Sequence, residues 1–308
     1  MKSKVSFGQK IFLFLERTAY KFLNASGLGN SPVRIFFSRA KTFLKKRIKP
    51  TTLTYLDICV AEHCNFSCYS CSRFSLLAEP EFPDLAITEN DLKRLSELSN
   101  GNIPVINING GEPLLNQELN EYFCITRKHF PCSHIRLITN GLLLLSQKED
   151  FWESVKNNNI SISPTKYPGI DWDKIEEKAN AFGCKLDYYD VTKGNKKLSR
   201  KFSLDVTGSQ NSTISFNQCP MAVCTTLKNG RLAMCPLVFS VNHFNKYFNQ
   251  NIPVTDFDSF DIYKAKTIQE IVDFLNKPIP LCAYCKSMGR EIVGEWRKSE
   301  KKITEWTE

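Results

Sequence analysis

The sequence contains no apolar run that approaches the ~20 residues of a membrane-spanning helix. Near the N-terminus, the apolar stretch 11–15 is broken at once by Glu16 and Arg17, and no small-residue cleavage site follows. We therefore expect no transmembrane helix, no signal peptide and a cytoplasmic location. Cytosolic thiols are kept reduced, so the 12 cysteines are not expected to form a disulfide framework. Metal or cluster ligation, catalysis and burial remain as explanations.

Acidic side chains are almost absent from the first 50 positions. Only Glu16 stands there against 12 of the 41 Lys and Arg, which gives this segment a charge of +11. The other residues hold 29 basic and 31 acidic side chains, which sum to −2. Segments 5–24 and 31–48 are expected to form two basic helices. They either pack on the main domain or, through residues 1–48, dock at the inner face of a membrane. Their aromatic residues follow helical core spacing, which argues against nucleic-acid binding.

From residue 54 onward, apolar runs alternate with helix-like segments. A helix is expected at 88–99, with its cap at Thr88 and the cap's partner Asp91 three residues later. Further helices are expected at 116–130, 147–158 and 171–183. Strands are expected at 54–60, 103–109, 133–140, 160–163, 184–190 and 213–217. This alternation predicts parallel βα units, which are too few here for an eight-fold barrel. We therefore predict an α/β fold built on a partial (β/α)6 TIM-like barrel.

The sequence changes in character at Cys219. Five of the 12 cysteines follow, the helical pattern becomes sparser, and the charged tail 295–308 is expected to form a final helix. The sequence therefore predicts three parts: a basic helical extension at 1–50, the partial barrel at 51–217 and a cysteine-rich domain at 218–308.

Three cysteines, Cys64, Cys68 and Cys71, stand together directly after the first predicted strand. Barrel folds build their active sites at that end of the strands. Three thiolates can hold three irons of a [4Fe–4S] cube and leave the fourth iron open to a ligand. A closed zinc site would need a fourth protein ligand. The spacing therefore favours an open cluster over zinc.

The run C-N-F-S-C-Y-S-C, residues 64–71, resembles the Cys-x3-Cys-x2-Cys loop of the radical S-adenosylmethionine (SAM) superfamily. Most members have an aromatic residue immediately before the third cysteine, whereas this chain has Ser70 there and Tyr69 one position earlier. The resemblance implies that SAM chelates the open iron. One electron from the cluster, supplied by a reductant such as flavodoxin or ferredoxin, then cleaves SAM to methionine and a 5′-deoxyadenosyl radical.

The second predicted strand ends in N-G-G-E-P, residues 109–113. The two glycines permit a close backbone approach or a positive φ. This stretch resembles the superfamily motif that holds the amino group of SAM. Positions after the third and fourth strands resemble weaker cofactor-lining residues, although each is equally explained by a turn or a helix cap. The resemblance thus assigns cofactor binding to Gly110, Gly111, Glu112, Pro113, Asn140 and Ser163.

The later cysteines include a Cys-x2-Cys knuckle at 282–285, which alone is typical of zinc. A turn at Gly230 is expected to fold the preceding stretch into a hairpin. The whole array resembles the auxiliary-cluster "twitch" subdomain, a half-length relative of the SPASM domain. That resemblance implies a second [4Fe–4S] cluster with the ligands Cys219, Cys235, Cys282 and Cys285.

Cys224 is left over from that set. Three roles stay open for it: a cluster ligand in place of Cys219, a hydrogen donor or resolving thiol near the active site, or a buried core residue. The remaining cysteines, Cys59, Cys124, Cys132 and Cys184, are expected to lie in the core.

The order of features in residues 54–290 resembles radical SAM proteins associated with glycan and polysaccharide biosynthesis. This implies an oxidoreductase or epimerase that abstracts hydrogen from a small-molecule or lipid-linked sugar-like substrate. The auxiliary cluster would assist electron transfer. Two alternatives stay open: a maturase that modifies a peptide or protein side chain, and a non-catalytic zinc or Fe–S protein. Side chains near predicted strand ends, each equally explained as a surface residue, are Arg136, Lys166, Tyr167 and Asp190.

Overall fold

The computed structural model describes residues 52–307 except 190–196, 220, 223 and 287–291. The predicted basic helices at 5–24 and 31–48 lie outside the described residues. Within the described part, no helix combines the length and the apolar character needed to cross a bilayer.

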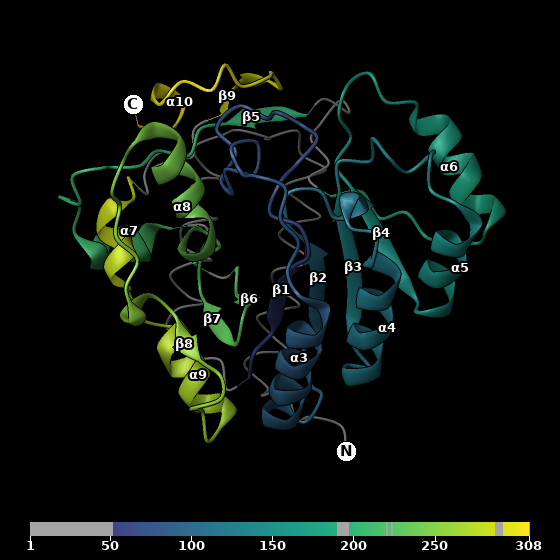
Figure 1. Cartoon of the computed structure of the whole chain (residues 1–308), viewed down its shortest axis with the longest axis horizontal. Helices are drawn as coiled ribbons and strands as arrows, with labels where there is room; N and C mark the ends of the chain where they lie inside the picture. Colours follow the sequence, from purple (N-terminus) through teal and green to yellow (C-terminus); the bar gives the residue numbers. More distant parts are fainter. Residues whose placement is uncertain (1–51, 190–196, 220, 223, 287–291, 308) are drawn as a thin grey trace, which may run out of the picture. The chain divides into compact units, whose positions relative to one another are not determined.

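A seven-stranded sheet forms the centre of the fold (Figure 1). Its order is β4-β3-β2-β1-β6-β7-β8. Strands β1–β4 and β6 run parallel, β7 pairs antiparallel with β6, and β8 pairs antiparallel with β7. A separate pair joins β5 and β9. This mostly parallel α/β architecture confirms the predicted fold class and does not require a closed barrel. The strands are β1 (Tyr55–Cys59), β2 (Val105–Asn109), β3 (His134–Thr139), β4 (Ile160–Pro164), β5 (Leu198–Arg200), β6 (Thr226–Lys228), β7 (Arg231–Ala233), β8 (Phe260–Asp261) and β9 (Ile292–Glu295).

Helices follow the parallel strands, and α3 and α4 pack side by side (Figure 1). Their apolar faces, such as Leu92 and Leu95 of α3, join one hydrophobic core with the strands. The helices are α3 (Leu85–Ser99), α4 (Leu119–His129), α5 (Glu149–Asn157), α6 (Trp172–Ala181), α7 (Ser212–Gln218), α8 (Leu237–Phe248), α9 (Ile268–Leu275) and α10 (Thr304–Thr307), with 3-10 turns at Pro113–Leu115, Asp256–Asp258 and Pro280–Tyr284.

Helix α3 begins earlier than predicted. Its cap is Asp84, whose side chain accepts a hydrogen bond from Ile87 N at 2.9 Å, and not Thr88. The predicted partner of that cap, Asp91, has another use, because its carboxylate accepts from Gly230 N at 2.6 Å and from the Tyr263 hydroxyl at 2.8 Å. A distant hairpin therefore fixes a residue that the local pattern assigned to a helix terminus.

Two of the six predicted strands are wrong. Residues 213–217 lie in α7, where the Asn211 side chain caps the helix by accepting from Ile214 N at 3.0 Å. A side-chain cap here outweighs the β-propensity of a short apolar run. The described part of 184–190 forms only isolated parallel bridges to β4, at Leu186 and Tyr189. The sheet is extended instead on the other side of β1, by β6.

The Gly230 hairpin is confirmed. Asn229 and Gly230 connect β6 to β7 with φ values of 47° and 72°, the left-handed pair that a tight hairpin requires. Because β6 pairs with β1, the described residues after 217 share a sheet with the barrel strands, and the predicted boundary at 217/218 stays a prediction.

The predicted final helix at 295–308 is mostly wrong. The tail begins as β9, which pairs with β5, continues as an extended segment and has only one helical turn, α10. Tertiary contacts override the charged helical pattern here, because Trp296 and Trp306 both donate hydrogen bonds to the cysteine loop at 60–72.

The strand register gives the main sheet one apolar and one polar face. Leu56, Ile106 and Ile135 belong to the buried hydrophobic core. The alternate positions align as a continuous polar row across five neighbouring strands, formed by Thr226, Asp57, Asn107, Arg136 and Ser161. We call this row, together with Tyr55, Asn109 and Ser163 from the same side of their strands, the polar face.

Candidate functional site

The cysteines of the predicted cluster loop, Cys64, Cys68 and Cys71, lie on the segment that leaves the carboxyl end of β1. Cys64 Sγ accepts from Phe66 N at 3.3 Å and from Asn140 Nδ2 at 3.7 Å. Burial raises the pKa of the Cys64 and Cys68 thiols, and the neighbouring cysteines add to that rise. The three thiols therefore share one partly buried environment. A nearby cationic cluster would be needed to hold them as thiolates.

The C-terminal tail packs on this loop, which the sequence did not predict. Tyr69 N donates to Arg297 O at 3.1 Å and Ser299 N donates to Ser67 O at 3.0 Å. The Arg297 guanidinium lies 4.0 Å from the centre of the Tyr69 ring. Trp306 Nε1 donates to Cys71 O at 3.0 Å. Backbone pairing thus fixes the loop from outside the barrel strands.

Ser70, at the position where most superfamily members have an aromatic residue, has a structural explanation. Its φ of 50° is left-handed, a conformation that bulky side chains disfavour. Its hydroxyl accepts a hydrogen bond from Phe202 N at 2.8 Å. The aromatic neighbour Tyr69 faces the tail instead of the third cysteine.

Gly110 and Gly111 allow the end of β2 to contact the start of the cysteine loop. A Cβ on Gly110 would lie 2.3 Å from Ala61 O, and one on Gly111 would lie 2.0 Å from His63 O. Gly111 N donates to Ala61 O at 2.7 Å, and Glu112 N donates to His63 O at 3.1 Å. A shallow hollow that Glu62 and Arg73 also line adjoins both glycines. The close backbone approach that the two glycines permit is therefore an approach to the backbone of the cysteine loop.

Glu112 is fully buried and joins the G-G-E-P stretch to the turn after β3. Its carboxylate accepts from Thr139 Oγ1 at 2.6 Å, from Asn140 N at 2.8 Å and from Leu114 N at 3.1 Å. Burial raises the pKa of Glu112 to about 7, against the effect of these three donors. No lysine, arginine or histidine among the described residues forms an ion pair with it. A buried carboxylate without a cation suits a site for an ammonium group such as that of SAM.

Glu112 predicts a pH dependence of stability. Because its pKa is higher in the folded chain than its ordinary 4.5, the folded state binds the extra proton between these values. The contribution of Glu112 to the free energy of unfolding is fully present below about pH 4.5. It falls by on the order of 3 kcal/mol as the pH rises through about 7. Urea unfolding of wild type and Glu112→Gln across pH 5–8 measures it. The difference between the two proteins is expected to change with pH, and a constant difference would show that Glu112 keeps an ordinary pKa.

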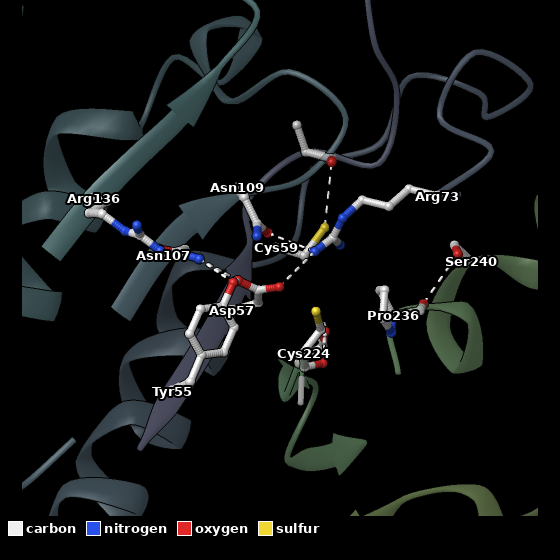
Figure 2. A network of polar contacts seen from close by, with 12 residues as sticks. Tyr55, Asp57, Cys59, Arg73, Asn107, Asn109, Arg136, Cys224, Pro236 and Ser240 are labelled. Atoms are coloured by element: carbon white, nitrogen blue, oxygen red, sulfur yellow. Dashed lines mark hydrogen bonds and ion pairs between the residues drawn. The ribbon is translucent and has the colours of Figure 1, made fainter. Parts of the chain in front are cut away.

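The polar face carries a connected network of buried side chains (Figure 2). Asp57 accepts from the Tyr55 hydroxyl at 2.7 Å, from Asn107 Nδ2 at 2.9 Å and from Arg73 at 3.3 Å. Arg73 also donates to Asn109 Oδ1 at 3.0 Å, and Arg136 Nε donates to Asn107 Oδ1 at 2.8 Å. Burial raises the pKa of Tyr55, and the charge of Asp57 adds to that rise. The network thus presents donors and acceptors in fixed positions.

Sequence reasoning missed Asp57, Asn107 and Asn109. A signal was present in the alternation of apolar and polar residues in L-D-I-C, I-N-I-N and I-S-I-S. Strands of a parallel sheet that are covered on both faces by apolar layers are near-continuously hydrophobic. Alternation in these parallel strands therefore indicates one face turned to a polar interior.

A second buried network holds the start of the cysteine loop. Glu62 accepts from Lys228 Nζ of β6 at 2.7 Å and lies 3.1 Å from His243 Nε2 of α8. Burial alone would raise the pKa of Glu62, but the hydrogen bond with His243 and the charge of Lys228 lower it to about 2. The charged carboxylate therefore ties the loop to β6 and α8 over the whole physiological range of pH.

The later cysteines divide into a group of four and a separate one. Burial raises the pKa of Cys235, and the neighbouring Cys219, Cys285 and Cys282 raise it further. Cys224 instead interacts electrostatically with Tyr55 on the polar face. Figure 2 shows its sulfur directed toward the Asp57 network. The electrostatic surroundings of Cys235 thus include the other three cysteines named by the resemblance, whereas Cys224 interacts with Tyr55.

The other candidate residues are dispersed. Ser163 is buried, and its hydroxyl has no hydrogen-bond partner within the described part of the chain, a vacancy that suits a cofactor group. Asn140 contacts Asn65 and Cys64 of the cysteine loop. Lys166 pairs with Glu176 at 3.3 Å, away from the polar face network. Asp190 lies outside the described residues.

Cys59 and Cys184 are buried as predicted, whereas Cys124 and Cys132 are exposed. The core assignment of the latter two is therefore wrong. Among the residues described, no three His, Cys, Asp or Glu side chains converge closely enough to hold a single metal ion. The donor chemistry of the two cysteine groups nevertheless fits thiolate-ligated clusters.

No family model matches this chain. Over 120 residues it is 31% identical to GTP 3′,8-cyclase of Sulfurimonas denitrificans, which covers 36% of this chain and 35% of that protein. The cyclase of Clostridium botulinum is 26% identical over 162 residues, 53% of this chain and 47% of the relative. These relatives support the radical SAM superfamily. The chain spans about a third of the length of the first of these curated relatives.

Among solved structures, BtrN in complex with AdoMet and 2-DOIA is similar with a TM-score of 0.48 and 17% identity, over 76% of this chain and 93% of that one. Streptococcus suis SuiB is similar with a TM-score of 0.37 and 18% identity, over 59% and 45% of the two chains.

Proposed function

We propose that this protein is a radical SAM enzyme that abstracts a hydrogen atom from a hydroxyl- or amine-bearing carbon of a sugar-like substrate. The observation that carries the proposal is the position of the three-cysteine loop at the carboxyl end of a strand whose inner face is polar and buried. When bound, the cluster and SAM would supply the one-electron chemistry. The chain's own residues would bind the cofactor and the substrate, orient them and exclude water from them.

Cofactor binding is assigned to residues that meet at the carboxyl ends of β1–β4. Cys64, Cys68 and Cys71 would hold the cluster. Glu112 would face the amino group of SAM through its buried charge or through the Thr139–Asn140 turn that it orders. The unpartnered Ser163 hydroxyl would accept or donate one hydrogen bond to the cofactor.

The polar face supports a hydroxylated substrate. A carboxylate, a guanidinium and two amides, held in fixed orientation by each other, match the paired donors and acceptors of neighbouring hydroxyls. Asp57 and Asn107 are 4% and 1% exposed, so a substrate bound beside them would be shielded from bulk water. An apolar peptide side chain would offer these groups no additional hydrogen bonds.

We propose the second cluster for Cys219, Cys235, Cys282 and Cys285, with Cys219 rather than Cys224 as the fourth ligand. Mutual electrostatic effects of these thiols support the choice. Cys224, beside Tyr55, is then available to return a hydrogen atom in an epimerisation. Oxidation of the substrate would instead pass its second electron to the auxiliary cluster.

Ser161 tests the substrate assignment with little structural disturbance. Its buried hydroxyl has no hydrogen-bond partner in the described structure, so Ser161→Ala breaks no bond in the free protein. We expect unchanged thermal stability and a KM for substrate raised about 10-fold, the effect of one hydrogen bond. Steady-state kinetics with an aminocyclitol or sugar that the enzyme converts measures this KM. An unchanged KM would remove Ser161 from the substrate site.

The matched control is Ser99→Ala. Ser99 Oγ is likewise buried without a partner in the described structure, but it lies on α3 behind the sheet. Its loss should leave KM unchanged.

The substrate class itself is tested with a panel of sugars, aminocyclitols and peptides. Turnover of a peptide and of no sugar or aminocyclitol would replace the favoured substrate class with the maturase alternative.

A further inference from the structure

The C-terminal tail lies against the middle cysteine of the first loop. An isolated antiparallel bridge pairs Lys298 with Cys68, and the hydrogen bonds from Tyr69 to Arg297 and from Ser299 to Ser67 flank it on both sides. Upstream, Trp296 N donates to Lys197 O at 2.8 Å. This backbone pairing fixes the position of Trp296 relative to Cys68.

Two side chains bring polar hydrogens to the Cys68 sulfur. Trp296 Nε1 lies 3.3 Å from Sγ and donates to it, and Tyr167 Oη, just after β4, also lies 3.3 Å from Sγ. A thiol can donate to the tyrosine hydroxyl, but a thiolate can only accept. With a cluster bound, both groups would therefore donate to the same sulfur.

Aromatic packing holds both donors in place. The Phe66 ring lies 4.5 Å from that of Tyr167 and 5.0 Å from that of Trp296, and the rings of Tyr167 and Trp296 are 5.5 Å apart. Trp172 Nε1 also donates to Tyr167 O at 3.0 Å. The two donors come from segments about 130 positions apart in sequence and meet at one sulfur, so local loop geometry does not explain them.

Hydrogen bonds to a cluster thiolate withdraw negative charge from the sulfur. The reduced cluster carries one more electron than the oxidised cluster, so donors stabilise the reduced form more and raise its reduction potential. Two donors on one thiolate therefore make the cluster easier to reduce.

We propose that Trp296 and Tyr167 are positioning residues that raise the reduction potential of the cluster held by Cys64, Cys68 and Cys71, through hydrogen bonds to the Cys68 sulfur. The tail thereby adjusts the electron-accepting step of the enzyme. This inference rests on the proposed function, because it requires the first cluster to be present.

The test compares Tyr167→Phe, which keeps the ring and removes only the hydroxyl donor, with Trp296→Phe, which keeps an aromatic ring and removes the indole N–H. Anaerobic redox titration followed by electron paramagnetic resonance gives the midpoint potential, and the signal that changes on addition of SAM identifies the first cluster. Each variant should retain the iron content of the wild type and have a more negative midpoint potential. The double variant should be the most negative of the three.

Trp306→Phe is the matched control, because Trp306 donates to the Cys71 carbonyl oxygen and not to a sulfur. It should keep the wild-type potential even where it lowers thermal stability. Unchanged potentials in Trp296→Phe and Tyr167→Phe with full iron content would overturn the inference, and so would loss of the first cluster from both. Wild-type protein without any iron would instead overturn the proposed function itself.

Discussion

Replacing Cys64, Cys68 and Cys71 together with alanine is expected to abolish reductive cleavage of SAM. The three thiols are the only cysteines on the loop after β1, and Cys219, Cys282 and Cys285 instead influence the pKa of Cys235. Activity should fall by at least ~10³-fold, because the group that carries the electron to SAM is lost. The measurement is 5′-deoxyadenosine formed under anaerobic reducing conditions.

Two further variants separate this effect from a general loss of thiols. Cys124→Ala with Cys132→Ala removes exposed cysteines and should leave cleavage unchanged. Cys282→Ala with Cys285→Ala should allow uncoupled cleavage of SAM while product formation from the substrate is lost. SAM cleavage that survives in the Cys64/Cys68/Cys71 variant would place the cofactor site elsewhere.

Gly111→Ala is expected to have the largest effect of any single methyl group added to the site. The new Cβ would lie 2.0 Å from the His63 carbonyl oxygen. The two backbone segments are joined by the hydrogen bonds from Gly111 N to Ala61 O and from Glu112 N to His63 O. Neither segment can move without breaking these bonds. We expect a loss of about 3 kcal/mol or more in the free energy of unfolding and a reduced iron content. Chemical denaturation and iron analysis measure the two effects.

Gly169→Ala provides the control. Gly169 has a φ of 81°, so a side chain there is strained, but no atom lies within 4 Å of the added Cβ. Gly169→Ala should lower the free energy of unfolding by about 1–2 kcal/mol and leave the iron content unchanged. Equal effects of the two substitutions would show that the contact between the glycine pair and the cysteine loop is not important for the site.

The sequence was sufficient to predict the first four strands and their order along the chain. Each is a short apolar run followed by a helix, and the two cofactor-like stretches follow the first two strands. The Gly230 hairpin was also predictable, because an Asn-Gly pair determines its own turn type. These features depend on residues that are close together in the chain.

The sequence was not sufficient where distant contacts decide the local structure. Residues 213–217 resemble a strand but form α7, and there the missed signal was a local one, the capping residue Asn211. The tail resembles a helix but pairs with β5 and the cysteine loop, because backbone partners there are supplied by segments more than 90 residues away. The polar row across β6, β1, β2, β3 and β4 could be seen as alternation in each strand, but only the register brings its members together.

We propose that the chain holds two iron–sulfur clusters and no structural zinc. The most direct test is the content of iron, sulfide and zinc in wild-type protein that has been purified and reconstituted without oxygen. The expected content is about eight irons and about eight sulfides per chain. About one zinc per chain in place of iron would contradict it, because the cysteine groups would then be structural and the polar face would have no radical chemistry to serve.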